Sequence, residues 1–367
     1  MNQRAEQGKY ETAARRWAGV GPYYAMFPAS FAADVVKEHT KRGQIVLDPF
    51  AGRATALYAA ASEGRIGLGI EINPVGWVYG KAKLQTATRR SVEKQLRWLG
   101  EQAPSYGAEA AQLPQFFDWC FCQRVKNFLV GARDLLDWRR RKTDWTTMAL
   151  LMIELHGKRA NSLSNQMRQT KAMSPHYAVE WWRERDLRPL DLNPVEFMLK
   201  KVAWRYAKGR LPTGKSRVYL GDSRDQLAGL TARLGDGRAK LLFTSPPYCG
   251  VTNYFYDQWL RLWLLGGPNK PQSPGEPCKR KFENRKDYIE MLRTVFLRSK
   301  PLLSRSAVVY VRTDARKFTR EATIQALECA FPNKRLREQT HSRPGFTQTE
   351  LFDSDAQSKG EIDFVMW

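Results

Sequence analysis

The stretch LLFTSPPYCGVTNY at residues 241–254 places chemically distinct side chains directly after a short apolar run. The length and the flanks of the run predict a buried strand that ends at Thr244. The strand cannot continue through Pro246 and Pro247, because proline has no backbone N–H for a sheet and its ring fixes φ. A rigid turn with polar and aromatic side chains therefore follows a buried strand.

This turn could hold an exocyclic amine of a nucleobase, which is a poor nucleophile because its lone pair is conjugated into the ring. The Ser245 hydroxyl and the Pro246 carbonyl offer two acceptors for the amine hydrogens, which would favour a tetrahedral nitrogen and free the lone pair. Pro247 stiffens the turn, and the Tyr248 ring could stack on a base that has left the duplex. The alternative, a strand exit without function, would explain only the prolines.

A second group of such residues lies in IVLDPFAGRATALYAAASEGRIGLGIEINP, at residues 45–74. Asp48 ends a predicted strand, a glycine-bearing turn leads into a helix, and Glu71 ends the next strand. This order is typical of a nucleotide-type cofactor site: Gly52 lets the backbone approach the ligand, and Glu71 could accept hydrogen bonds from ribose hydroxyls. The absence of GxGxxG disfavours a dinucleotide. An ordinary strand–turn–helix with a charge at the helix N-terminus remains the alternative.

The elements that must position both groups alternate between strands and helices. A helix is predicted over 54–63, and strands are predicted over 44–48, 65–71, 217–222, 239–244, 307–312, 335–343 and 361–367. This alternation predicts an α/β fold with a doubly wound, mostly parallel, Rossmann-like sheet of about seven strands. The last two strands have no helical pattern between them and could pair antiparallel at an edge.

The long interval between the second and third strands has a helical pattern. We expect three parts: residues 1–90 and 216–367 form the two halves of the sheet domain, and residues 91–215 form an inserted helical module. The module is rich in aromatic residues next to basic runs, and such aromatic residues lie in a core more often than they stack on bases. They are Trp119, Trp138, Trp145, Trp181, Trp182 and Trp204. Residues 266–286, rich in Pro, Gly and Lys/Arg, are expected to form a mobile basic surface loop.

Charge is the strongest global signal in the composition. The chain has 60 Lys and Arg residues against 37 Asp and Glu residues, a formal net charge of +23. A partner with a phosphate backbone would require such a charge. The alternative is a basic, well-solvated surface.

Other bulk properties exclude several classes of protein. A content of 43% hydrophobic and 12% aromatic residues predicts a folded globular chain. We expect a cytoplasmic protein without a membrane partner, because no apolar run approaches the roughly 18 residues that span a bilayer and the N-terminus has no apolar signal core. The five cysteines and four histidines form no framework of disulfides and no paired zinc motif, so no metal is expected.

With both groups in place, the sequence resembles the S-adenosylmethionine-dependent DNA amino-methyltransferases, which modify cytosine N4 or adenine N6. TSPPY at residues 244–248 matches the catalytic motif of that family, and DPFAGRAT at residues 48–55 is similar to its cofactor loop, usually Asp-Pro-Phe-x-Gly-Ser-Gly-Thr. Arg53 and Ala54 depart from that pattern. The catalytic motif follows the cofactor motif, an order that places a target-recognition region between them, where the helical module lies.

The resemblance implies further site residues. Phe27 and Pro28, in YYAMFPASF, would pack on the methionine part of S-adenosylmethionine, and Asp222, in YLGDSRDQL, would lie beside its adenine. The remaining cofactor-binding residues implied by the matched motifs are Asp48, Pro49, Phe50, Gly52, Thr55, Glu71 and Thr244.

The activity implied is methylation of the exocyclic amine of a flipped base in double-stranded DNA. The serine form of the motif favours cytosine N4 over adenine N6. Restriction–modification or phage defence would be the biological role, with a cognate restriction endonuclease as a further partner. Two alternatives are methylation of an amine in RNA and a catalytically silent DNA-binding subunit with the same fold.

Overall fold

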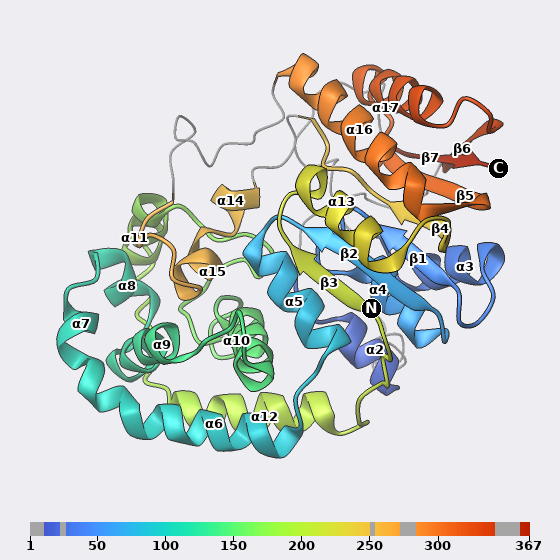
Figure 1. Cartoon of the computed structure of the whole chain (residues 1–367). Helices are drawn as coiled ribbons and strands as arrows, with labels where there is room; N and C mark the ends of the chain where they lie inside the picture. The colour runs from blue at the N-terminus through green and yellow to red at the C-terminus, as the bar shows by residue number, and fades with distance from the viewer. Residues whose placement is uncertain (1–10, 23–26, 250–253, 272–283, 342–359) are drawn as a thin grey trace. The chain divides into compact units, whose positions relative to one another are not determined.

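The computed structural model describes residues 11–22, 27–249, 254–271, 284–341 and 360–367. The chain folds into two compact units, each made of several segments (Figure 1). The helical unit comprises Met1–Tyr23, Lys81–Leu211 and Tyr254–Lys279, and the sheet unit comprises Tyr24–Gly80, Pro212–Asn253 and Arg280–Trp367. The chain therefore passes repeatedly from one unit to the other.

The sheet unit contains a seven-stranded sheet within the described residues, in the order β3-β2-β1-β4-β5-β7-β6. The strands are β1 Ile45–Asp48, β2 Ile66–Glu71, β3 Arg217–Leu220, β4 Ala239–Thr244, β5 Leu303–Asp314, β6 Leu336–His341 and β7 Glu361–Met366. The first five strands in that order are parallel, and β7 runs antiparallel to both of its neighbours. The predicted doubly wound α/β sheet is confirmed, as is the antiparallel pairing of the last two strands.

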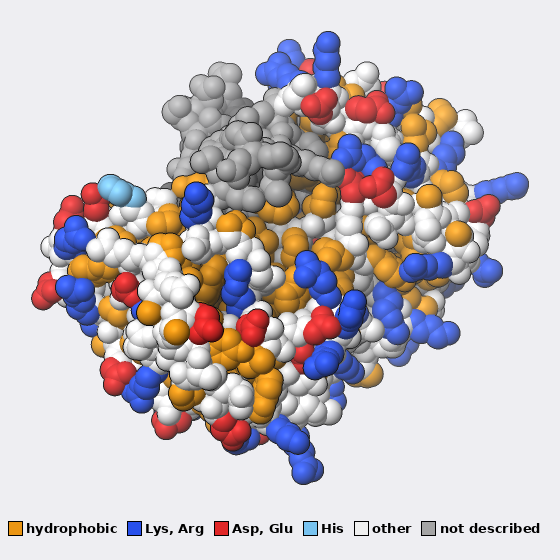
Figure 2. All heavy atoms as spheres, turned by 60° about the vertical axis from the view of Figure 1, so that its left-hand side comes forward, with side chains coloured by type: hydrophobic (Ala, Val, Ile, Leu, Met, Phe, Trp, Pro, Cys, Tyr) orange, Lys and Arg blue, Asp and Glu red, His pale blue; other side chains and the backbone are white. Residues whose placement is uncertain are grey.

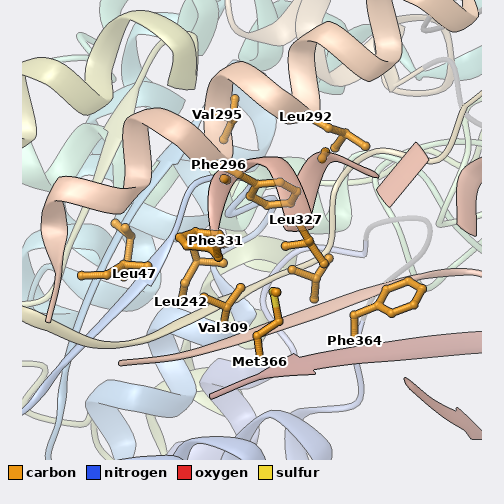
Figure 3. Packing of buried hydrophobic residues seen from close by; sticks show 14 of the residues in the cluster. Leu47, Leu242, Leu292, Val295, Phe296, Val309, Leu327, Phe331, Phe364 and Met366 are labelled. Atoms are coloured by element: carbon orange, nitrogen blue, oxygen red, sulfur yellow. The ribbon is translucent and has the colours of Figure 1, made fainter. Parts of the chain in front are cut away.

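Helices cover both faces of this sheet. Neighbouring residues of a strand point to opposite faces. Leu47 packs in the core under α13 (Ser223–Leu234), α16 (Arg285–Ser299) and α17 (Lys317–Ala330); Figure 3 shows it with core residues of α16 and α17. Val46 instead packs on the opposite face, against α3 (Ala29–His39) and α4 (Thr55–Ser62). Strands buried on both faces explain why their sequences are almost continuously apolar.

The order of the strands reverses between β1 and β4, which are neighbours in the sheet. The chain moves outward from β1 to β2 and β3, and then returns to the other side of β1 as β4. In open parallel sheets, ligands bind outside the carboxyl ends of the strands at such a reversal. The carboxyl ends of β1 and β4 are Asp48 and Thr244.

Capping residues in the sequence set the beginnings of several helices. Thr88 accepts a hydrogen bond from the backbone of the first turn of α6 (Arg89–Gln102), and Asn193 does so for α12 (Pro194–Tyr206). Asp222 and Asn284 cap α13 and α16 in the same way. Such caps satisfy backbone N–H groups that have no partner inside the helix.

The helical unit contains no named strand in its described part. Its remaining helices are α2 Ala13–Ala18, α7 Gly107–Ala111, α8 Gln115–Cys120, α9 Gln123–Leu135, α10 Lys142–Glu154, α11 Pro175–Arg183, α14 Tyr254–Asp257 and α15 Trp259–Leu264, with a 3₁₀ turn, η1, at Ala103–Tyr106. Helix α5 (Pro74–Leu84) and the 3₁₀ turn η2 (Lys300–Leu302) complete the described elements. Four of the six tryptophans expected in the core, Trp119, Trp138, Trp145 and Trp182, are buried, whereas Trp204 is exposed.

Two expectations concern segments at the limits of the described structure. Most of the predicted loop at residues 266–286 lies outside the described residues, which omit 272–283. Of the helices that are described, none has both the length and the apolar character needed to span a membrane.

Candidate active site

A hydrogen bond joins the ends of β1 and β4. The Thr244 hydroxyl donates to Oδ1 of Asp48 at 2.6 Å, although 196 residues separate the two positions in the chain. The backbone N–H of Phe50 donates to the same oxygen at 3.1 Å. Asp48 and Thr244 are both buried, and the bond connects the loop after β1 to the turn after β4.

Glu71, at the end of β2, holds the other side of the loop after β1. Its Oε2 accepts a hydrogen bond from the backbone N–H of Gly52 at 2.6 Å, and its Oε1 accepts one from the N–H of Asn73 at 2.7 Å. Gly52 has a φ of +53°, a value that favours glycine. A Cβ on Gly76, in the first turn of α5, would lie 2.8 Å from the Gly52 carbonyl oxygen, so α5 packs directly on this loop.

The two buried carboxyl groups have shifted acidities. Burial raises the pKa of Asp48 to about 7, although the hydrogen bonds from Thr244 and Phe50 oppose this effect. Burial likewise raises the pKa of Glu71 to about 7, opposed by its two backbone hydrogen bonds and reinforced by the charge of Asp48. Clustered carboxyl groups with pKa values near neutrality are more common at functional sites than elsewhere.

The loop between β1 and α4 contains an uncommon backbone conformation. Ala54 has a φ of 61° and a ψ of 42° and immediately precedes Thr55, the first residue of α4. Alanine is strained in this left-handed region, whereas glycine is not. The cofactor loop that DPFAGRAT resembles usually has glycine at the position of Ala54. The alanine of this chain is therefore strained where glycine would not be.

Asp222 and Ser223 bring the start of α13 to the same place. The N–H of Gly221 donates to the Glu71 carbonyl at 3.0 Å, which places Asp222 beside the end of β2. Asp222 caps α13 and forms an ion pair with Arg224, with a distance of 2.8 Å between Oδ2 and Nη2. The Ser223 hydroxyl donates to the carbonyl oxygen of Pro49, a contact that the sequence did not predict.

The turn after β4 is only partly accessible. Ser245 and Pro247 are half-buried, whereas Pro246 and Tyr248 are buried, with 7% of Tyr248 exposed. The main-chain carbonyl of Cys249, the residue that follows, accepts a hydrogen bond from Nη2 of Arg316 at 2.7 Å.

Arg316 is itself held by Asp314, the last residue of β5. The Arg316 Nε and Nη2 atoms lie 3.0 and 2.8 Å from the two carboxylate oxygens of Asp314, and Asp314 is buried. Sequence reasoning missed this pair, for which the only signal was an acidic and a basic residue two positions apart at the end of a strand, in VRTDARKFT.

Phe27 and Pro28 lie at the beginning of α3, where Phe27 contacts β4. The Phe27 ring stacks on Phe243 of β4, with ring centroids 4.8 Å apart and planes 11° apart. Phe27 is buried in the aromatic core beneath α3, and Pro28 is half-buried at the beginning of that helix. Burial in the core accounts for Phe27 without a ligand.

Asn73 adds a polar group that the sequence did not single out. Its Oδ1 accepts a hydrogen bond from the N–H of Val75, but its buried Nδ2 has no hydrogen-bond partner within the described residues. A buried donor without a partner is costly, and a ligand with a polar acceptor beside Glu71 would satisfy it. The described residues contain no group of three or more His, Cys, Asp or Glu side chains that could hold a metal ion.

The strand order, the reversal between β1 and β4 and the buried carboxyl groups define a Rossmann-like methyltransferase fold. Residues 2–75 of the chain match the DNA methylase family. The matched range includes Phe27, Pro28, the loop after β1 and Glu71 but ends before the turn after β4. The match supports a DNA methyltransferase in general. No curated protein matches the chain.

Proposed function

We propose that this chain moves a methyl group from S-adenosylmethionine to the exocyclic amine of a base flipped out of double-stranded DNA. Cytosine N4 is favoured over adenine N6, because the turn has serine at its first position. The observation that carries the proposal is the hydrogen bond between Thr244 and Asp48. It brings the expected cofactor loop and the expected catalytic turn together at the topological reversal of the sheet.

The residues around Glu71 fit S-adenosylmethionine. The Glu71 carboxylate keeps lone pairs for ribose hydroxyls besides the two that its backbone donors use. The Asn73 Nδ2 is a buried donor available to the nucleoside part, and Asp222 follows the neighbouring strand. We assign the amino-acid end to the loop of Asp48, Pro49, Phe50, Gly52 and Thr55. The cofactor supplies a methyl group on a positively charged sulfur, the electrophile of the reaction.

The turn after β4 binds and activates the target base. The Ser245 hydroxyl and the Pro246 carbonyl accept the two amine hydrogens, draw the nitrogen toward tetrahedral geometry and make its lone pair available. Pro247 keeps these acceptors in place, so little reorganisation accompanies the reaction. Tyr248 stacks on the flipped base. Because little of Tyr248 is exposed, stacking requires the groups that cover its ring to move aside when DNA binds, while the two acceptors stay in place.

The biological setting follows from the chemistry. An exocyclic amine that carries one methyl group keeps one hydrogen for base pairing, so methylation marks DNA and leaves its pairing intact. Such a mark fits restriction–modification or phage defence in the cytoplasm. A cognate restriction endonuclease that cleaves unmarked DNA would be its functional partner.

The first experiment identifies the product. The purified chain is incubated with labelled S-adenosylmethionine and, in parallel, with unmethylated duplex DNA or structured RNA, and the digested nucleosides are identified by mass spectrometry. We expect label in N4-methylcytosine. Label in N6-methyladenine would show that the target atom is adenine N6 instead of cytosine N4. Label in RNA but not DNA, or no label together with no cofactor binding, would refute the proposal in favour of an RNA enzyme or a silent subunit.

A double variant tests the turn itself. Ser245→Ala with Tyr248→Ala should bind S-adenosylmethionine as the parent does but lose methyl transfer. Ser105→Ala with Tyr177→Ala removes the same groups from exposed positions of the helical unit and should retain activity. Retained turnover in the first double variant would contradict the assignment.

A further inference from the structure

Five basic side chains of the helical unit lie in and around the irregular segment between α10 and α11, and we call them the loop cations. They are Lys158, Arg159, Arg168, Arg183 and Arg188. All are exposed except Arg159, which is half-buried. None of the five forms an ion pair with an acidic side chain in the part of the chain that the structure describes. By contrast, Arg89 and Arg124 of the same unit pair with Glu93 and Asp191.

Unpaired cations are frequent on a chain with 60 basic and 37 acidic residues, and Lys and Arg side chains are spread widely over the face drawn in Figure 2. Charge alone therefore does not distinguish a binding surface from a solvated one. In the loop cations, unpaired charge is combined with side chains that neighbouring groups hold in place and with a backbone segment that is anchored from inside.

Arginine side chains converge on Trp119 of α8. The guanidinium carbon of Arg188 lies 3.7 Å from the centroid of the Trp119 ring, and that of Arg183 lies 5.6 Å from it. Arg159 donates from Nε and Nη2 to the Arg188 carbonyl at 3.1 and 2.9 Å. A stacked guanidinium loses less conformational freedom when it binds a phosphate, and its planar donors match phosphate geometry.

The segment that carries Lys158, Arg159 and Arg168 is anchored from inside by polar groups. Asn165 is fully buried and donates from Nδ2 to the carbonyls of Trp119 and Leu187 at 3.1 and 2.8 Å. The N–H of Met167 donates to the Gly157 carbonyl at 2.8 Å, which brings the two ends of the segment together. Irregular backbone is therefore held rigidly, with its basic side chains outward.

A second anchor comes from α15. Arg261 is fully buried and donates from Nε to the Met152 carbonyl at 2.9 Å and from Nη2 to the Gln169 carbonyl at 2.5 Å. Burying a charged side chain to hold two main-chain carbonyls is costly compared with an apolar contact. The cost is understandable if the position of residues 168–170 matters for function.

The exposed tip of the segment is strained. Ala160 has a φ of +70° and directly follows Lys158 and Arg159. A non-glycine residue in this region is strained, and such strain clusters at binding sites, where the surroundings must impose it.

We propose that the loop cations form a preorganised surface that binds the phosphate backbone of double-stranded DNA. The proposal rests on DNA being the substrate of the proposed function and names the part of the helical unit that contacts it. Phosphate contacts position a protein on DNA without reading its sequence, so this surface should bind duplexes of unrelated sequence with similar strength.

The test compares two matched pairs of substitutions in the full chain. Lys158→Gln with Arg168→Gln removes two loop cations whose charged groups make no described structural contact. Arg89→Gln with Arg124→Gln removes the same charge from ion-paired positions. Binding of a fluorescent duplex is measured by anisotropy at several salt concentrations, and S-adenosylmethionine binding and thermal unfolding are measured alongside.

We expect the first pair to weaken duplex binding about tenfold or more and to reduce the slope of log K against log salt by about 2. The second pair should change affinity and slope much less, and cofactor binding should be unchanged in both. Arg183→Gln with Arg188→Gln should act like the first pair, whereas Arg183→Lys with Arg188→Lys should keep the salt dependence and recover only part of the affinity, because lysine keeps the charge but lacks the planar, stacked donors.

The failures can be told apart. Suppose that the parent chain methylates DNA. If the two double variants then lose the same affinity for the duplex, or if neither loses any, the proposed surface is wrong but the proposed function stands. A parent that neither binds nor methylates duplex DNA would overturn the proposed function as well. Preferential binding of structured RNA that is lost in the first pair would overturn DNA as the partner of this surface.

Discussion

Asp48 and Glu71 are buried carboxyl groups whose pKa values, about 7, lie above the ordinary values of 3.8 and 4.5. The folded chain therefore holds protons that the unfolded chain has already released. Protonation favours the folded state most below pH 4, and this contribution is lost as pH rises through about 7. These residues should make the chain less stable at mildly alkaline than at mildly acidic pH.

Asp48→Asn should remove part of this dependence. The asparagine keeps an oxygen to accept from Thr244 and Phe50 but carries no charge. We expect the melting temperature of the variant to fall less than that of the parent between about pH 5 and pH 8, and to exceed it at about pH 8. Asp236→Asn, at an exposed position, is the control. Parallel melting profiles for Asp48→Asn and the parent would argue against the shifted pKa.

Ala54 tests the strain in the loop before α4. Ala54 and Ala56 are both fully buried, so replacement by glycine removes a packed methyl group from each and loosens the unfolded chain equally. Only Ala54 has a positive φ. Ala54→Gly should therefore be less destabilising than Ala56→Gly by about 1–2 kcal/mol. Denaturant unfolding of the two variants measures the difference, and equal losses would show that Ala54 is unstrained.

Arg316 tests whether the main chain behind Tyr248 is positioned by β5. Arg316→Gln removes the donor to the Cys249 carbonyl, so we expect kcat for methyl transfer to fall about tenfold to a hundredfold with S-adenosylmethionine affinity unchanged. Arg316→Lys should recover part of the loss. The control is Arg320→Gln, which breaks a surface ion pair with Glu338. A fall in cofactor affinity without a fall in kcat would contradict a role in the turn.

At the scale of elements, helix α5 and the loop after β1 depend on each other through Gly76. The Cβ of an alanine there would meet the Gly52 carbonyl at 2.8 Å and the Glu71 side chain at 3.1 Å. Gly76→Ala should displace the loop and weaken S-adenosylmethionine binding about tenfold, measured by calorimetry.

Gly229 supplies the matched control because it lies within α13, and a Cβ there would meet nothing within 4 Å. Gly229→Ala should stabilise the chain by about 0.5–1 kcal/mol and leave cofactor binding unchanged. Unchanged binding in Gly76→Ala as well would mean that the loop tolerates the displacement.

The positions of all seven strands could be predicted from the sequence, in most cases because buried strands are short apolar runs with clear breaks; β6 is instead largely polar. Their order could not, since local pattern does not reveal which strands become neighbours. Strand β5 begins at Leu303, earlier than predicted, because the polar stretch Ser304–Ser306 hides its first residues. Strand β7 lies between β5 and β6, although it follows β6 in the chain.

At the scale of the whole molecule, the site was predictable as motifs but not as contacts. Asp48, Glu71 and the turn after β4 stood out because their residue types are unusual at strand ends. Ser223 and Arg316 did not, since each contacts a distant part of the chain: Ser223 and Pro49 are 174 residues apart, and Arg316 and Cys249 are 67 apart. Asn73 did not, because only the structure shows that its buried Nδ2 has no partner within the described residues. The helical unit likewise combines three separate segments. The composition of the sequence does not change at the ends of these segments, so the combination could not be predicted.

The position of β7 also bears on how the chain is made. During synthesis β5 and β6 are made before residues 361–366, so the edge of β5 that pairs with β7 stays unpaired until β7 has been made and released. Arg312 on β5 also has no acidic partner until then, because Asp363 and Glu361, with which it forms ion pairs, lie on β7. A nascent or truncated chain would therefore expose an unpaired strand edge beside an uncompensated charge, a form prone to aggregation and a natural client for chaperones.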